Sequence, residues 1–246
     1  MDKFIDAHCH IIPGVDDGAK NTEDTANMLK IAYDEGIRCI VATPHHHPKR
    51  GMSDLDLLRQ QIKIAREEAA KIDKEFRVYL GMEVLFSHDI PGKIKDNKIC
   101  GINNKPVMLV EFSPGDKFHY ILNGVKLVQS QGMDVIMAHC ERYKCLVDNM
   151  EYVDHLVEMG VKLQINAGSI GNKSGRRIGK FTYNLMENDY VFCVGTDAHN
   201  TDTRAPHIKE AAEYVSKNFG RAYMKKIFFD NMAEILKKRI KEENIK

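Results

Sequence analysis

Three features are missing from this chain of 246 residues, and each absence excludes a class of protein. No apolar run approaches the roughly 20 residues that a helix needs to cross a bilayer. Neither sign of charge dominates, because 36 Lys and Arg face 35 Asp and Glu, so no polyanion-binding surface is indicated. The first residues lack the apolar core of a signal peptide. We therefore expect a cytoplasmic protein that neither inserts into membranes nor binds nucleic acid.

Two cysteine patterns are missing as well. No Cys-x-x-Cys pair occurs, and without a secretion signal we expect all the cysteines to be reduced thiols, several of them in apolar runs. No cysteine is followed six positions later by an arginine, so the Cys-x5-Arg phosphate loop of thiol phosphatases is absent. The six cysteines occupy positions 9, 39, 100, 140, 145 and 193.

Apolar segments alternate with helix-like ones along the chain, and 43% of the residues are hydrophobic, enough for a full core. Continuous apolar runs such as 37–43 are typical of strands buried on both faces. Ser53 to Asp56 forms a capping box that predicts a helix over 54–73. We expect strands at about 3–8, 37–43, 76–83, 106–111, 134–138, 161–166 and 190–195.

Seven strand–helix units predict an α/β fold, with a parallel sheet inside, helices outside and right-handed crossovers between them. A closed or nearly closed barrel is our first expectation, and an open doubly wound sheet is the second. No linker, low-complexity tract or change in composition marks a second domain, and single α/β barrels of this length are common. We therefore expect residues 1–246 to form one domain.

His8 and His10 lie at the end of the first predicted strand, where side-chain alternation puts both on one face. Neutral imidazole nitrogens bind zinc, manganese, iron and nickel. Similar residues recur at the ends of later strands, and α/β barrels carry their active site at that end. The predicted ligand set is His8, His10, Asp17, His45, Glu83, Glu111, His139, Asp197 and His199.

Each of these residues has an ordinary alternative explanation. Glu83 and Glu111 fit surface carboxylates or helix-cap partners, and His139 fits a satisfied core histidine. Together, however, so many ionisable groups are costly to bury in one pocket unless metals neutralise the carboxylates. Three metals with about three protein ligands each would use all nine residues. His46 or His47 remains an alternative to His45.

Two arginines and one glycine-rich loop lie close to the predicted rim. Arg142 and Arg204 follow the last histidines of two strands, and paired hydrogen bonds from two arginines can clamp a phosphate. A solvated arginine is the alternative at either position. The loop with glycines between Gly168 and Gly179 fits a mobile lid better than a phosphate cradle.

From about residue 2 to residue 240, the chain resembles the polymerase and histidinol phosphatase (PHP) superfamily. Within it, His139-Cys-Glu-Arg-Tyr143 and Asn166-Ala-Gly-Ser169 are similar to the capsule-operon branch, the manganese-dependent protein-tyrosine phosphatases of bacterial exopolysaccharide loci. The motifs that carry the superfamily resemblance are His8-x-His10, Asp16-Asp17-Gly18, Thr43-Pro44-His45, Gly81-Met82-Glu83, Glu111-Phe112-Ser113, Ala138-His139-x-Glu141-Arg142-Tyr143 and Asp197-Ala198-His199-Asn200.

This resemblance implies a distorted, TIM-like seven-stranded barrel with three divalent metal ions, manganese first, with iron or zinc as alternatives. It implies that Arg142 and Arg204 bind phosphate. The substrate that it implies is the phosphotyrosine tail of a bacterial tyrosine autokinase that drives capsular polysaccharide synthesis. The implied ligand sets are His8, His10, Glu83 and Asp197 for one ion, Glu83, Glu111 and His139 for the second, and Asp17, His45 and His199 for the third.

The implied reaction is direct hydrolysis by a hydroxide held between two metals, without a phosphoenzyme. Four alternatives stay open at this point: a small-molecule phosphatase such as one acting on histidinol phosphate, a nuclease or phosphodiesterase, an amidohydrolase, and a metal-bound regulator without activity. Assembly into a homo-oligomer also stays open.

Overall fold

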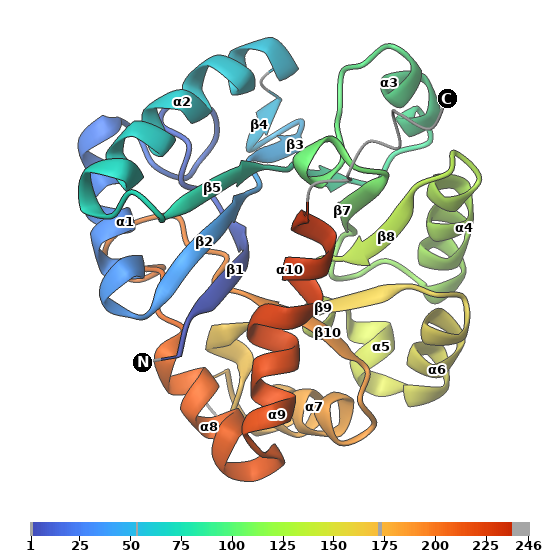
Figure 1. Ribbon diagram of the computed structural model, residues 1–246. Coiled ribbons are helices and arrows are strands. Elements are labelled where there is room, and N and C mark those ends of the chain that lie inside the picture. The colour runs from blue at the N-terminus through green and yellow to red at the C-terminus, as the bar shows by residue number, and fades with distance from the viewer. Residues whose placement is uncertain (1, 53, 172–173, 238–246) are drawn as a thin grey trace, which may run out of the picture.

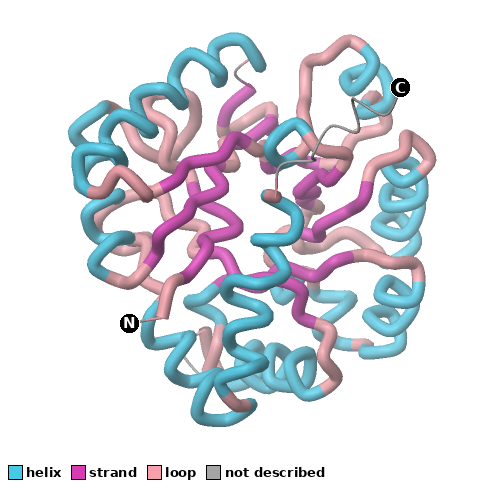
Figure 2. The backbone as a smooth tube through the Cα atoms, viewed as in Figure 1, coloured by secondary structure: helices cyan, strands magenta, loops and turns pink. Residues whose placement is uncertain are grey.

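Parallel strands fill the middle of the computed structural model, and helices surround them (Figures 1 and 2). The structure describes residues 2–52, 54–171 and 174–237. The strands form two hydrogen-bonded sheets. The first sheet, in the order β1-β2-β5, holds Phe4–Cys9, Ile37–Ala42 and Arg77–Leu80. The second, in the order β10-β9-β8-β7-β6-β3-β4, holds Val191–Gly195, Lys162–Asn166, Asp134–Met137, Val107–Glu111, Glu83–Leu85, His45–His47 and Gly51–Met52.

The helices follow the strands in alternation, as the sequence predicts. Asn21 caps the first helix by accepting a hydrogen bond from the backbone N–H of Asp24. The second helix corrects our expectation, because its N-cap is Asp54, which accepts from the N–H of Leu57, while Ser53 lies outside the described residues. The helices α1 to α10 are Thr22–Asp34, Leu55–Ile72, Ile90–Lys95, Phe118–Gln129, Lys144–Asp148, Met150–Glu158, Arg176–Glu187, Lys209–Phe219, Arg221–Lys225 and Asn231–Leu236.

The predicted strand at 76–83 is divided in two, and this division separates the two sheets. At Gly81-Met82 the chain leaves the first sheet as β5 and enters the second as β6. The neighbouring β2 continues into β3 through Thr43-Pro44 in the same way. The two interruptions stay in register, since Gly81 N–H donates to Ala42 O and Glu83 N–H donates to Pro44 O. The predicted α/β fold with parallel strands is thus confirmed, but the ladders of the described residues form two sheets and not one closed barrel.

The edge strand β1 of the first sheet meets the edge strand β10 of the second sheet. Asp197 N–H donates to His8 O, and His10 N–H donates to Ala198 O, just beyond the ends of β10 and β1. The strands also face two separate cores. One core lies between the strands and the outer helices. The other lies between the two sheets and includes Ile5 of β1, Leu109 of β7 and Met232 of α10.

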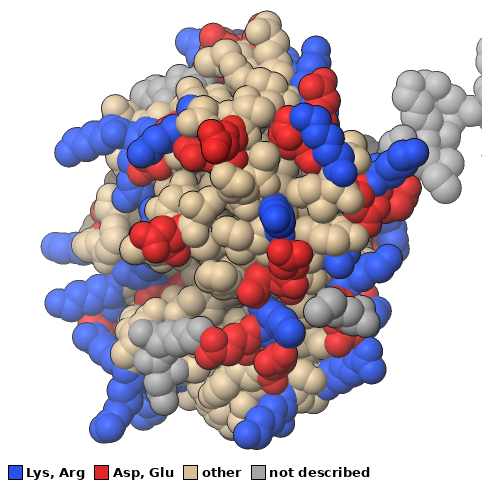
Figure 3. All heavy atoms as spheres, turned by 90° about the vertical axis from the view of Figure 1, so that its left-hand side faces the viewer, with Lys and Arg blue, Asp and Glu red and all other residues tan. Residues whose placement is uncertain are grey.

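Helix α10 covers the amino-terminal ends of the strands. It lies across the middle of the view in Figure 1, and Lys237 at its end accepts a hydrogen bond from Lys105, which precedes β7. The carboxyl ends of the strands are therefore the free edge of the inner core. Within the described ranges, no helix combines the length and the apolarity needed to span a bilayer. On the face in Figure 3, basic and acidic side chains are interspersed.

Candidate metal-binding active site

The nine residues of the predicted ligand set come together at the carboxyl ends of the strands. Eight of the nine form three overlapping groups, and the ligand atoms of each group all lie within 4.8 Å of one another. The groups are His10, Asp17, His45 and His199; His8, His10 and Asp197; and His45, Glu83 and Glu111. His139 joins through its Nε2, which lies 2.8 Å from Glu83 Oε1 and 3.6 Å from Glu111 Oε1. Eight of the nine are buried, and only Asp17, with a side chain 46% exposed, reaches solvent. Which atoms bind which ion stays a prediction.

Three of the histidines are oriented by acceptors that determine which ring nitrogen carries the proton. Gln164 Oε1 accepts from the backbone N–H of His139 at 2.8 Å, so the same oxygen, 3.1 Å from His8 Nδ1, must accept from that nitrogen too. Asp16 Oδ2 lies 2.7 Å from His10 Nδ1. The Nδ1 of His199 donates to the backbone oxygen of Asp197 at 2.9 Å. Each of these rings therefore presents a free Nε2 lone pair to the cluster.

When the rings are neutral, these lone pairs converge in a way that requires positive charge between them. His8 Nε2 and His10 Nε2 lie 3.1 Å apart, and Glu83 Oε2 lies 3.3 Å from each. Asp197 Oδ1 lies 3.6 and 3.5 Å from the same two nitrogens. Four acceptor atoms that face one another repel unless positive charge lies between them. The donor set of imidazole and carboxylate fits a divalent transition metal.

Buried atoms without a hydrogen-bond partner point to the same conclusion. Among the described residues, six such atoms belong to the cluster, although buried polar atoms are normally paired. They belong to two of the three groups of ligand atoms and to His139, so the residues present fit a group of cations rather than an ordinary polar core. The six atoms are Nδ1 and Nε2 of His45, Oε2 of Glu83, Oε2 of Glu111, Nδ1 of His139 and Nε2 of His199.

The electrostatics of the cluster favour positive charge. Burial lowers the pKa of His8, but Glu83 and Asp197 outweigh it and raise that pKa above its ordinary value. Burial opposes ionisation of Glu83 too, yet the histidines around it hold its pKa well below the usual range. Burial, His10 and Arg204 together lower the pKa of His199 to about 2, which keeps its ring neutral and able to bind a metal.

Two residues of the cluster have a left-handed backbone, which costs roughly 1 to 3 kcal/mol for a residue other than glycine. His139 has φ of 31° and Asp197 has φ of 53°. Both conformations are held by hydrogen bonds from their own N–H groups, to Gln164 Oε1 and to His8 O. This strain turns both side chains from the ends of β8 and β10 into the cluster.

Both predicted phosphate-binding arginines lie at the mouth of the cluster. Arg142 donates to Asp197 Oδ2 at 2.6 Å, and Arg204 donates to Asp197 Oδ1 at 2.8 Å. Each side chain is 39% exposed, so each guanidinium contacts both the cluster and solvent. A hollow of about 290 Å³ lies beside them, lined also by Asn166, Ser169 and Thr203.

The three consecutive histidines differ in position, and the position of His45 supports its prediction as a ligand. His45 lies beside Glu83 and Asp17, with Nδ1 2.8 Å from Glu83 Oε2 and Nε2 3.3 Å from Asp17 Oδ1. His46 alternates to the other face of β3, where burial and then Lys93 lower its pKa. His47 stands at the rim, where its Nδ1 accepts from the N–H of Lys49.

Sequence reasoning assigned no role to four polar residues that contact the cluster, although two of them, Asp16 and Asn166, lie in the motifs of the resemblance. Asp16 holds His10 and also accepts from the N–H of His45, while Gln164 holds His8 and His139. Asn166 donates to Asp197 Oδ2, and Arg50 approaches Glu111 Oε1 at 3.3 Å. A signal for two of them was present, because Gln164 and Asn166 are uncharged polar residues that alternate with apolar Leu163 and Ile165 at the end of the strand.

The thiols of the chain are unsuited to nucleophilic attack. All six cysteines are free. Burial raises the pKa of each thiol, to about 12 for Cys39 and about 11 for Cys100, so the reactive thiolate is scarce at neutral pH.

The loop predicted as a lid is described only in part, because residues 172–173 lie outside the described residues. Gly168 lies in the 3-10 turn Ala167–Ser169, and α7 begins at Arg176.

Comparisons with known proteins agree on one family. Residues 4–237 match the family model described as "Capsular polysaccharide synthesis, CpsB/CapC". The tyrosine-protein phosphatase CpsB of Streptococcus agalactiae is 31% identical over 241 residues, which cover 95% of this chain and 98% of that protein. The tyrosine-protein phosphatase YwqE of Bacillus subtilis is 31% identical over 217 residues, which cover 88% of this chain and 85% of that protein.

Solved structures give the same result. One from a study of YwqE of Bacillus subtilis and CpsB of Streptococcus pneumoniae, described as unique metal-dependent tyrosine phosphatases, aligns with a TM-score of 0.81 at 30% identity over 89% of both chains. A variant organophosphorus hydrolase from Deinococcus radiodurans aligns with a TM-score of 0.64 at 11% identity, over 95% of this chain and 93% of that one, which shows a shared fold alone.

Proposed function

Because the chain belongs to the CpsB/CapC family of capsular polysaccharide synthesis, we propose that it is a metal-dependent protein-tyrosine phosphatase. The observation that carries this proposal is the set of converging, unpartnered nitrogen and oxygen atoms directly beside two half-exposed arginines. Such a set can hold cations and a phosphate group together. A phosphate monoester is therefore the substrate class that the site fits best.

The proposed metals are three divalent ions, manganese first and iron or zinc as alternatives. His8, His10, Glu83 and Asp197 would hold one ion, Glu83, Glu111 and His139 the second, and Asp17, His45 and His199 the third. When bound, such ions lower the pKa of a coordinated water molecule and offset negative charge on phosphoryl oxygens. Support comes from the three overlapping groups of ligand atoms, which contain eight of the nine residues, and from the contact of His139 with both glutamates.

The roles of the protein's own groups follow from their positions. Arg142 and Arg204 bind the phosphoryl oxygens from the solvent side, where each has donors left over beyond its bond to Asp197. Asp16 and Gln164 keep the Nε2 atoms of His10 and His8 aimed inward. In the overall reaction a water oxygen bonds to phosphorus, and the bond from phosphorus to the tyrosine oxygen breaks. Phenolate is a better leaving group than an alkoxide, so little acid assistance is needed.

The proposed architecture is a single domain, residues 1–246, with seven strand positions arranged as a distorted barrel. Two of the seven positions are interrupted strands, β2 with β3 and β5 with β6. The inner core supports this arrangement, because strands of both sheets and α10 contribute to it. The bonds between the ends of β1 and β10 support it as well.

The proposed biological substrate is the phosphotyrosine tail of a bacterial tyrosine autokinase, and its dephosphorylation would regulate capsular polysaccharide synthesis in the cytoplasm. The test compares phosphate release from a tyrosine-phosphorylated kinase tail and from histidinol phosphate, each with manganese and with a chelator. Manganese-dependent preference for the tail is expected. Preference for histidinol phosphate would overturn the tyrosine assignment, and no release from either substrate would overturn the phosphatase proposal.

A further inference from the structure

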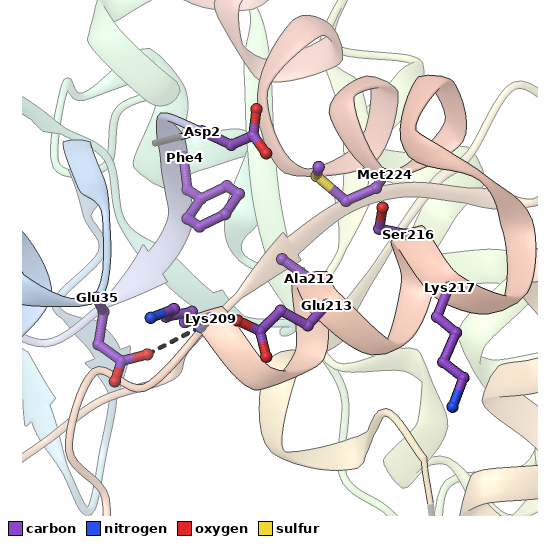
Figure 4. Close-up of a pocket in the computed structure, with 9 residues that line it drawn as sticks. All are labelled: Asp2, Phe4, Glu35, Lys209, Ala212, Glu213, Ser216, Lys217 and Met224. Atoms are coloured by element: carbon purple, nitrogen blue, oxygen red, sulfur yellow. Dashed lines mark hydrogen bonds between the residues drawn. The ribbon is translucent and has the colours of Figure 1, made fainter.

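Three neighbouring hollows lead away from the arginines along the surface. The first, about 290 Å³, contains Arg142 and Arg204. The second, about 500 Å³, shares Gly168 and His207 with the first. The third, about 420 Å³ and shown in Figure 4, shares Glu35, Lys209 and Glu213 with the second. Each hollow thus adjoins the next through shared lining residues around the start of α8, and we call the three together the α8 groove.

The carboxylate of Glu35 and several small side chains shape this groove. Glu35, directly after α1, accepts from the N–H groups of Ile208 and Lys209 at 3.0 and 2.8 Å and so fixes the start of α8. Small residues keep the second hollow open, among them Ala167 and Ala211. In the third hollow, buried Phe4 and Met224 present apolar surface, as Figure 4 shows for the two side chains.

We propose that the α8 groove binds the polypeptide that flanks the phosphotyrosine of the substrate. This inference rests on the proposed phosphatase function. A phosphate and one aromatic ring need a hollow of the size of the first one, whereas a row of three hollows continuous with the arginines suits an extended chain. Apolar surface at the far end suits side chains of such a chain.

The charges of the groove select among polypeptides. Around the second and third hollows stand four acidic side chains, Asp2, Glu35, Glu210 and Glu213, and two basic ones, Lys209 and Lys217. Asp2 is paired with Arg221, and Glu35 is engaged by the start of α8. Glu213 is exposed and lines both hollows, so it contributes most directly to recognition. Its carboxylate therefore favours a basic over an acidic substrate residue at the point where the two hollows adjoin.

The test uses three substrates: para-nitrophenyl phosphate and two phosphotyrosine peptides of equal length, one with lysines and one with glutamates on both sides. The variant is Glu213→Lys, and its control is Glu67→Lys, an exposed glutamate in the middle of α2. We expect Glu213→Lys to lower kcat/KM for the lysine peptide about threefold or more through KM, since exposed charge pairs contribute effects of this order. The same variant should raise kcat/KM for the glutamate peptide and leave para-nitrophenyl phosphate unchanged.

The outcomes separate this inference from the function on which it rests. If the wild-type protein hydrolyses none of the three substrates, the phosphatase proposal fails. If it hydrolyses para-nitrophenyl phosphate but Glu213→Lys treats both peptides as the wild type does, the groove proposal fails alone. Equal effects of Glu213→Lys and Glu67→Lys would indicate overall charge and would also overturn the groove.

Discussion

Replacement of Gln164 by methionine tests whether the residues behind the histidines control metal binding. Methionine has a similar length and no hydrogen-bonding amide, so the fully buried site keeps its volume. Three hydrogen bonds disappear: Gln164 no longer accepts from His8 Nδ1 at 3.1 Å or from the N–H of His139 at 2.8 Å, and no longer donates to Asn166 Oδ1 at 2.9 Å. His8 is then free to rotate or to carry its proton on the nitrogen that faces the cluster.

The expected magnitudes follow from these three contacts. A buried polar group left without a partner costs about 1 to 3 kcal/mol, so three of them cost at least about 3 kcal/mol. For a chain of this length, that loss lowers the Tm of the metal-free protein by about 6 to 12 °C. Loss of a group that orients a ligand weakens metal affinity by roughly 10- to 100-fold.

The assay titrates manganese into metal-free protein by calorimetry and records thermal unfolding of the same samples. Gln129→Met is the matched control, because its amide donates to Met159 O at 2.9 Å beside the amino-terminal ends of β8 and β9, opposite the rim. The control should lower Tm without changing manganese affinity. A Gln164→Met protein that is destabilised yet binds manganese as tightly as the wild type would refute the reasoning.

Four further predictions concern other parts of the molecule. Arg142→Lys should lower kcat/KM for aryl phosphates about tenfold or more, because an ammonium cannot form paired hydrogen bonds; an equal loss of manganese affinity would show that Arg142 instead serves to hold Asp197. Glu35→Gln should lower Tm at pH 7: burial opposes ionisation of Glu35, but the N–H groups at the start of α8 hold its pKa below 4.5. That contribution is present above pH 4.5 and is lost below it, so the Tm difference should shrink there, and a difference independent of pH would contradict the assignment. Gly124→Ala should cost about 1 to 3 kcal/mol in denaturant unfolding, because its Cβ would lie 2.7 Å from a ring atom of Phe112; no loss would mean that the ring moves freely. Manganese at 100 times its Kd should stabilise the wild type by about 2.7 kcal/mol, and Glu83→Gln should abolish this gain, whereas an unchanged gain would remove Glu83 from the ligand set.

The sequence was sufficient to find the rim because two simple rules act together. Side chains alternate along a strand, and parallel strands end at the same edge of a sheet. The ionisable residue at the end of each apolar run could therefore be assigned to one place without knowledge of any contact. His8, Glu111 and His139 follow these rules closely, since each lies within two residues of the end of its strand.

Features that depend on distant contacts could not be predicted. The run 76–83 has the sequence pattern of one strand, and its division at Gly81-Met82 depends on hydrogen bonds to Ala42 and Pro44 beside a neighbouring strand. Asp16 and Asp17 are adjacent and chemically identical, and only the fold of their loop decides which one contacts the Nδ1 of a histidine. Gln164 carried a signal in its alternation with Asn166, but its partners lie 25 and 156 positions away.

The local rules fail most clearly at the cluster, and the failures share one physical cause. A left-handed histidine and aspartate, two lone pairs 3.1 Å apart and six unpartnered buried atoms are each unfavourable by themselves. Hydrogen bonds to Gln164, Asp16 and the backbone of a neighbouring strand nevertheless hold this arrangement in place. A protein retains such an arrangement where a bound cation reverses the sign of the interactions, since converging acceptors repel one another but attract a metal. The same residues that local propensity would reject are therefore those that a metal-dependent reaction requires.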